Sequence, residues 1–199
     1  MILIACIGID SFAEERLVRV AGDPYPPWTE GEAGSQAIGG IAVEIAEELF
    51  RRLEMDIRVI VYPFKRGLER IEHGEEDVIL MLSKTKEREN NILFTSPIRH
   101  SKWVFYYLKG KTFRWSKWED LQTYRIGLVT GNNVGKDFPT AAEKYHFNIE
   151  KVKADIFNAD KLLLGRVDIV LADLEVMQRI INRTLNFKES LNGMKRPFC

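Results

Sequence analysis

The alternation of strand and helix patterns in the first 83 residues constrains the fold of this chain more than any other feature. Strand-like runs fall at three places, and two runs with the period of an amphipathic helix lie between them. Two strand–helix–strand units in succession predict an α/β fold with a mostly parallel sheet. The predicted strands cover 16–22, 56–64 and 77–83, and the predicted helices cover 41–55 and 65–76.

Two of these elements carry further information. The helix at 41–55 (IAVEIAEELFRRLEM) repeats apolar side chains every four residues, which predicts an amphipathic helix, at Ile41, Ile45, Leu49 and Leu53. The strand at 77–83 (DVILMLS) is apolar on both faces, which is typical of the middle of a parallel sheet.

A second α/β pattern follows the strand predicted at 102–109 and the polar connector 110–122. Its strands are expected at 124–131, 149–154 and 167–173, and its helices at 132–145, 158–166 and 174–184. Two α/β units joined by one extended strand predict two lobes with a cleft between them. We place the first lobe at 14–108 and the second at 109–199.

Charge and cysteine content exclude several classes of protein. Lys and Arg together number 29, as do Asp and Glu, so the chain lacks the basic excess of a general nucleic-acid or membrane-surface binder. The two cysteines, Cys6 and Cys199, lie at the ends of the chain, and no Cys/His set has the spacing of a zinc site. We therefore expect no disulfide in the mature chain, no metal, no cofactor and no nucleic-acid partner.

Residues 1–13 (MILIACIGIDSFA) have the apolar run and small residues of an export signal cleaved before Glu14, although no positive charge precedes Arg16. This pattern predicts a periplasmic protein that retains a remnant of its signal. Two alternatives stay open: a buried first strand, and a lipoprotein signal in which Cys6 carries the anchor.

The candidate binding residues are those that follow each predicted strand, because ligands of open α/β sheets bind beyond the carboxyl ends of the strands. Arg88 suits a carboxylate, Asp173 suits an ammonium group, and the aromatic rings suit a side chain. The set therefore has the groups needed to hold a zwitterion. Its members are Tyr25, Trp28, Phe64, Ser83, Thr85, Arg88, Asn132, Asn133 and Asp173.

Five motifs in order resemble those of the bacterial extracellular solute-binding proteins of family 3, the amino-acid-binding components of ABC uptake systems. They are YPPW in the first loop, GGIAVEIAEEL in the first helix, GEEDVILMLSKTKERENNILFTSPI, DLQTYRIGLVTGNNVGKDF and GRVDIVLADLEVMQ. The resemblance extends from about Arg16 to Leu185. It implies a two-lobed periplasmic-binding-protein-like fold of type II that closes around a small polar solute, an amino acid or a related compound.

The resemblance also implies roles for individual residues. Arg88 falls where the family holds the α-carboxylate, with Ser83 supporting it and Asn133 also meeting the carboxylate. Asp173 falls where the family holds the α-ammonium. The ligand side chain would lie between the rings of Tyr25, Phe64 and Trp28.

Further expectations follow from the resemblance and from the helix predicted at 132–145. A helix that begins near Asn132 would point backbone N–H groups and the positive end of its dipole at an anion. The resemblance implies an ABC permease in the inner membrane as partner, and we expect the binding protein itself to be monomeric.

The sequence departs from the family pattern in four places. Ala42 stands where the family often has Asp, apolar residues 80–82 replace a hydroxyl-rich strand end, and Asn132–Asn133 replaces a Thr/Ser pair. Family members continue with a last strand, a second crossing to the first lobe and a terminal helix, and we expect none of these in residues 186–199. The first three departures leave open the identity of the solute and whether it is an amino acid.

Alternative interpretations remain at this point. Arg88 could be a solvated helix-cap residue, and Asp173 could simply cap the helix that follows it. The chain could also be a ligand-sensing module of a signalling receptor. An enzyme of the dehydratase type on the same fold, with Glu44 as its acid or base, is a further alternative. No motif of a hydrolase elbow, a P-loop or a zinc protease is present, so we expect no enzyme.

Overall fold

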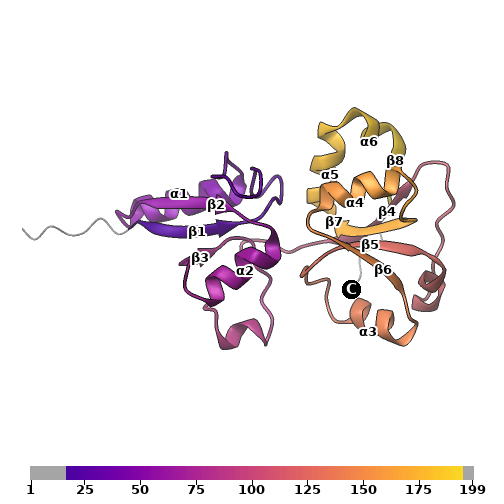
Figure 1. The fold of residues 1–199 in the computed structure, drawn as a ribbon, viewed down its shortest axis with the longest axis horizontal. Coiled ribbons are helices and arrows are strands. Elements are labelled where there is room, and N and C mark those ends of the chain that lie inside the picture. The colour runs from indigo at the N-terminus through magenta and orange to yellow at the C-terminus, as the bar shows by residue number, and fades with distance from the viewer. Residues whose placement is uncertain (1–16, 195–199) are drawn as a thin grey trace, which may run out of the picture.

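The computed structural model describes residues 17–194, which form two α/β lobes. Figure 1 shows the lobes lying end to end along the longest axis of the molecule, with the first in indigo and magenta and the second in orange and yellow. Residues 1–13, predicted to be an export signal, lie outside the described residues. None of the described helices is long and apolar enough to cross a membrane.

The first lobe is built on a parallel three-stranded sheet of order β2-β1-β3. Its strands are β1 (Val18–Gly22), β2 (Ile57–Val61) and β3 (Val78–Ile79), and its helices are α1 (Ile41–Arg52), α2 (Phe64–Glu72) and the short 3-10 helix η1 (Arg88–Asn90). The predicted order of elements is confirmed. The prediction that the third strand lies in the middle is wrong, since β1 is central and β3 is a short, half-buried edge strand of this sheet.

Helix α1 turns the predicted apolar stripe away from the sheet. Ile41, Ile45, Leu49 and Leu53 are each 41–57% exposed, whereas α1 packs on the first lobe through the small residues Ala42, Val43 and Ala46. The preceding loop fixes this orientation, because the N–H groups of the first turn of α1 donate to the carbonyl oxygens of Pro27 and Trp28. The amphipathic helix is confirmed, but its small residues rather than its larger ones face the core.

The second lobe has a mixed five-stranded sheet of order β6-β5-β7-β4-β8, in which β4 runs antiparallel to both neighbours. Its strands are β4 (Trp103–Leu108), β5 (Arg125–Val129), β6 (Asn148–Val152), β7 (Ile169–Asp173) and β8 (Leu191–Met194). The helices are the 3-10 helix η2 (Trp118–Thr123), α3 (Asp137–Lys144), α4 (Asp155–Leu163), α5 (Leu174–Arg183) and α6 (Leu185–Ser190).

Two features of this sheet differ from expectation. Strand β4 falls inside the range predicted for the first lobe, yet all its pairing is within the second sheet. Residues 185–194, where we expected no further strand, form α6 and β8, and β8 lies against the outer edge of β4. The second sheet therefore contains two antiparallel pairings, β4 with β7 and β4 with β8, that the alternating strand and helix pattern did not predict.

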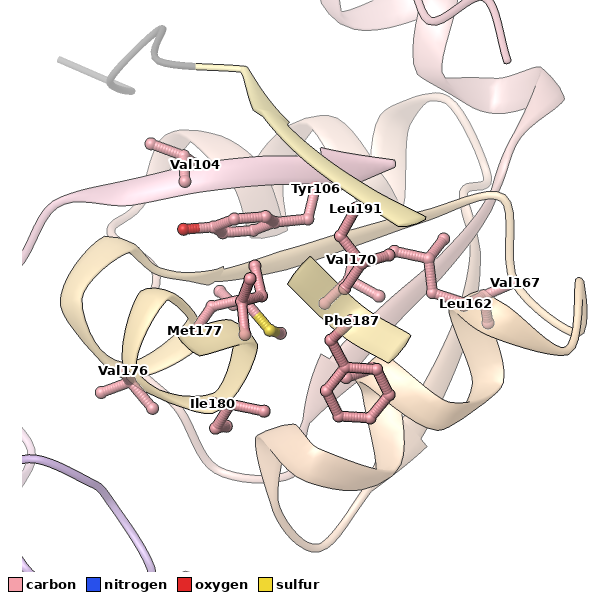
Figure 2. Close-up of a cluster of buried hydrophobic side chains, with 13 residues drawn as sticks. Val104, Tyr106, Leu162, Val167, Val170, Val176, Met177, Ile180, Phe187 and Leu191 are labelled. Atoms are coloured by element: carbon pink, nitrogen blue, oxygen red, sulfur yellow. The ribbon is translucent and has the colours of Figure 1, made fainter. Parts of the chain in front are cut away.

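The core of the second lobe lies on both faces of its sheet. Val104, Val170 and Tyr106 point to one face, where α4, α5 and α6 cover them. Figure 2 shows this cluster, with Met177 of α5 beside the ring of Tyr106. Alternate residues of the same strands point to the other face, where aromatic side chains from the connector 110–122 and from α3 pack. Strand β7, buried along its whole length, passes through the centre and ends at Asp173.

Candidate solute-binding site between the lobes

Arg88 lies in η1, beyond the end of β3, and its half-buried guanidinium reaches from the first lobe to the second. Its Nη1 donates to the carbonyl oxygen of Ser83 at 2.9 Å, and its Nη2 donates to the carbonyl oxygen of Gly131 at 3.3 Å. The guanidinium also lies over the ring of Phe64, 5.6 Å from the centroid. The hydroxyl of Thr85 accepts a hydrogen bond from the backbone N–H of Arg88 at 3.2 Å. The predicted residues of this group are therefore in direct contact with one another.

The charge of Arg88 has no counter-ion within residues 17–194. Both hydrogen-bond partners of the guanidinium are neutral carbonyl groups, and no carboxylate lies within ion-pair distance. Burial lowers the pKa of Arg88 below its ordinary value, although the charges of Glu87 and Glu72 oppose this effect. A half-buried guanidinium without a carboxylate partner is a site to which an anion can bind with two parallel hydrogen bonds.

The turn after β5 faces Arg88 from the second lobe. Gly131 has a φ of +85°, and a Cβ on it would lie 2.8 Å from the ring of Phe64, so glycine allows the two lobes to approach here. Asn133 accepts a hydrogen bond from the N–H of Gly135. Helix α3 begins only at Asp137, so the prediction of a helix N-terminus at Asn132 is wrong. Asn132 and Asn133 lie in a turn, and no helix dipole is directed from them at the cleft.

Asp173 ends β7 and is 1% exposed. Its Oδ1 accepts hydrogen bonds from the N–H groups of Glu175 and Val176, at 3.0 and 3.3 Å, so it caps α5. Its Oδ2 accepts a hydrogen bond from Nη2 of Arg99 at 2.5 Å. Asp173, which we predicted to bind the ammonium group of a ligand, is thus already paired with Arg99 of the same chain.

Arg99 was not predicted as a site residue. It lies in the segment that crosses from the first lobe to β4, and its side chain is 10% exposed. Besides its bond to Asp173 in the second lobe, its guanidinium stacks over the ring of Trp28 in the first lobe, 4.7 Å from the centroid. No local pattern could have revealed this residue, since its two partners are far from it in the sequence.

Tyr25 and Trp28 belong to a tight turn after β1 whose N–H and carbonyl groups bond to one another. Both rings pack against the core of the second lobe, and Trp28 packs against the core of the first as well. Burial raises the pKa of Tyr25, and the negative charges of Asp173 and Asp155 add to this effect. The predicted residues thus fall into two groups in the interlobe region, one around Arg88 and one around Asp173.

Two further carboxyl groups lie in the interlobe region and were not predicted. Asp23 follows β1, and Asp155, which is 3% exposed, follows β6 at the start of α4. Desolvation raises the pKa of both to about 7, and the charges of Asp23 and Asp173 add to the shift at Asp155. Both residues follow the carboxyl ends of strands, as the predicted site residues do, and this position is the signal in the sequence that could have identified them.

A charged contact and an open cavity lie beside this region. Glu30 of the first lobe accepts hydrogen bonds from Arg183 at 2.7 Å and from Arg179 at 3.2 Å, both from α5 of the second lobe. The cavity, of about 570 Å³, is lined by Pro24, Pro26 and Glu30 on one side and by Ala154, Ile180 and Arg183 on the other. None of the nine predicted site residues lines it. The guanidinium of Arg88, which has no counter-ion among the described residues, and the buried pair of Arg99 and Asp173 lie elsewhere between the lobes, so we place the candidate site there.

Comparison with known proteins agrees with this architecture. The chain is 24% identical over 182 residues to the putative ABC transporter arginine-binding protein 2 of Escherichia coli (strain K12), covering 88% of this chain and 70% of that protein. Among solved structures it resembles an ancestral arginine-binding protein bound to arginine, with a TM-score of 0.79 and 19% identity over 92% of this chain and 83% of that one. A histidine kinase sensor domain with similarity to periplasmic binding proteins matches with a TM-score of 0.81 and 18% identity, over 93% and 79% of the two chains.

At these identities the structural matches establish the fold, and the family is established by sequence. The profile of the bacterial extracellular solute-binding proteins, family 3, matches residues 18–186, most of the chain. The chain therefore belongs to family 3 of the bacterial extracellular solute-binding proteins.

Proposed function

We propose that this protein captures a small polar solute that carries a carboxylate, an amino acid or a related compound, and delivers it to an ABC permease. The observation that carries the proposal is the uncompensated charge of Arg88, held between the two lobes by neutral carbonyl groups. A carboxylate bound there would receive two charge-assisted hydrogen bonds from a planar guanidinium and would neutralise a half-buried charge.

Lobe closure is the mechanism that this geometry supports. Arg88 and Phe64 come from the first lobe, and the turn that begins at Gly131 comes from the second, so a solute in contact with both favours the closed arrangement. The solute need only bind the closed state more tightly than the open one to shift the population toward closure. The residues proposed to line the solute site are Arg88, Ser83, Thr85, Phe64, Asn132, Asn133, Tyr25 and Trp28. Asp173 belongs to the proposed site through its ion pair with Arg99.

The export of the chain by residues 1–13, its action in the periplasm as a monomer, and binding without turnover are parts of the same proposal. Recovery of a bound solute unchanged after long incubation, followed by nuclear magnetic resonance, tests the absence of turnover. Appearance of a product would instead favour the enzymatic alternative on this fold.

A ligand screen by thermal unfolding tests the proposal as a whole. The protein is stripped of solute by unfolding and refolding, then melted with amino acids, their oxo and hydroxy analogues, dicarboxylates and polyamines. A solute of micromolar affinity at millimolar concentration stabilises the folded state by about 4 kcal/mol, which raises the melting temperature of a chain of this size by about 8–16 °C. Stabilisation by polyamines alone, or by none of the carboxylates, would contradict the proposal.

Sensing is the second candidate, favoured by the similarity to a histidine kinase sensor domain. Affinity capture from solubilised membranes of the source organism, with and without the stabilising solute, separates the two roles. Recovery of an ABC permease by the solute-loaded protein supports transport, and recovery of a receptor kinase supports sensing.

A further inference from the structure

The carboxylate of Asp173 is fully used within the protein. Its Oδ1 accepts two backbone N–H groups of α5, and its Oδ2 accepts the Nη2 of Arg99. The side chain of Asp173 is 1% exposed, so it offers no appreciable surface to a solute. An ammonium group could reach Asp173 only after Arg99 had been displaced.

Displacement of Arg99 would break more than one contact. The guanidinium is also stacked on Trp28 at 4.7 Å and lies 3.8 Å from a carboxylate oxygen of Glu175. An incoming ammonium would replace one cation at Asp173 by another, and it would leave the guanidinium without its buried partner. Because removing one partner from a buried ion pair is strongly unfavourable, the exchange offers the solute no net gain.

The unused hydrogen-bonding groups of Arg99 favour a different kind of solute. Its Nε and Nη1 are buried and have no hydrogen-bond partner. Unpaired buried donors are costly and are satisfied by acceptors. An oxygen atom of a solute can accept from these donors, whereas an ammonium group can only donate and would be repelled by the guanidinium charge.

We propose that Arg99 is the permanent counter-ion of Asp173 and sets the specificity of the site, so that the solute is a small carboxylate with an oxygen acceptor in place of an α-ammonium. This inference rests on the proposed function, since it assumes that Arg88 holds the carboxylate. The class comprises 2-oxo acids, 2-hydroxy acids and dicarboxylates. Asp23 and Asp155 remain near Tyr25 as further carboxyl groups, so a cation at the far end of the solute is compatible with the inference.

Matched pairs of solutes that differ only at the carbon next to the carboxylate provide the test. Calorimetric titration of the whole chain would compare glutamate with 2-oxoglutarate and 2-hydroxyglutarate, leucine with 4-methyl-2-oxopentanoate, and arginine with its 2-oxo analogue. In the pairs that bind, we expect the oxo or hydroxy compound to bind at least tenfold more tightly than the amino acid. Tighter binding of the amino acid in those pairs, by tenfold or more, would overturn the inference and leave the proposed function intact.

Variants of Arg99 test whether this residue causes the preference for the oxo or hydroxy compound over the amino acid. Arg99→Lys keeps a cation at Asp173 and is expected to keep the wild-type order within each pair. Arg99→Met removes the cation while retaining apolar volume beside Trp28. In this variant we expect the ratio of the two affinities within each pair to shift at least tenfold in favour of the amino acid. An unchanged order in a folded Arg99→Met protein would overturn the role of Arg99. If Arg99→Met does not fold, tighter binding of the amino acid than of its oxo or hydroxy analogue by Arg99→Lys would also overturn the role of Arg99. Binding of none of the probes would contradict the proposed function itself.

Discussion

The guanidinium of Arg88 in the first lobe donates a hydrogen bond to the carbonyl oxygen of Gly131 in the second, at 3.3 Å. This bond joins the lobes through a charged donor and a neutral acceptor, so it leaves the charge uncompensated. Phe64 is close to both residues, since its ring lies beneath the guanidinium and would be 2.8 Å from a Cβ placed on Gly131. The approach of the lobes and the capacity to bind an anion therefore depend on one small cluster.

Substitution of Gly131 by alanine is expected to weaken solute binding about tenfold or more. The new Cβ would lie 2.8 Å from the ring of Phe64 and would push the lobes apart. Gly135→Ala is the matched control, because Gly135 has a similar φ of +81° but nothing within 4 Å of the added Cβ. Both variants should lose about 1–2 kcal/mol of stability from backbone strain, measured by urea unfolding. Equal losses of affinity in the two variants would contradict the steric explanation.

The contact of Glu30 with Arg179 and Arg183 is expected to stabilise the protein modestly and only above acidic pH. The hydrogen bond from Arg183, with help from Arg179, holds the pKa of Glu30 below its ordinary value. Because the folded-state pKa is depressed, the stabilisation is present above the ordinary pKa of glutamate and is lost as pH falls through the folded-state value.

Glu30→Gln should therefore lower the free energy of unfolding by about 0.5–1 kcal/mol at pH 7, and the difference should shrink below pH 4 and in high salt. The control is Glu32→Gln, since Glu32 is exposed and nearby. A difference that persists unchanged at pH 3 would show that the ion pair is not its source.

Asp155 is expected to make the protein less stable as the pH rises. Its pKa is raised to about 7 in the folded protein, whereas an aspartate in an unfolded chain has a pKa near 3.9. The folded state therefore binds more protons between about pH 4 and 7, so the free energy of unfolding falls as pH rises through that window.

Asp155→Asn cannot ionise and should lose this dependence, gaining on the order of 1–3 kcal/mol relative to the wild type between pH 5 and pH 8. Urea unfolding at several pH values measures the effect, with the exposed Asp160→Asn on the same helix as control. Parallel pH profiles for Asp155→Asn and the wild type would refute it.

Two substitutions in helix α1 test whether its small residues, rather than its apolar stripe of larger residues, face the core. Leu49 is 48% exposed and Val43 is 3% exposed. Leu49→Gln should change the free energy of unfolding by less than about 0.5 kcal/mol, whereas Val43→Ala should reduce it by about 1–2 kcal/mol. A larger loss from Leu49→Gln than from Val43→Ala would place the leucine stripe in the core.

The elements with strong local signals were predictable. Strand β7 and helix α5 follow directly from the apolar run at 167–173, the capping residue Asp173 and the periodic residues after it. The group around Arg88 was also predictable, because its members are contributed by loops at the carboxyl ends of strands.

What could not be predicted depends on contacts between distant residues. The orientation of α1 is set by carbonyl groups of Pro27 and Trp28, and the pairing of β4 within the second sheet depends on β7 and β8. Arg99 reaches an aspartate 74 residues away, and nothing in the residues around Arg99 encodes that partner. The start of α3 was predicted too early because Gly131 and Gly135, both with positive φ, extend the turn after β5.

The most direct test of the account is the affinity of the Arg88→Ala protein for the carboxylate solute that most stabilises the wild type, measured by calorimetric titration. Lys86→Ala serves as control, because it removes an exposed positive charge two residues away. Loss of the partner of a buried carboxylate costs about 3 kcal/mol or more, so we expect affinity to fall at least a hundredfold in Arg88→Ala and less than threefold in Lys86→Ala. Wild-type affinity in a folded Arg88→Ala protein would show that the solute binds elsewhere and would contradict the account.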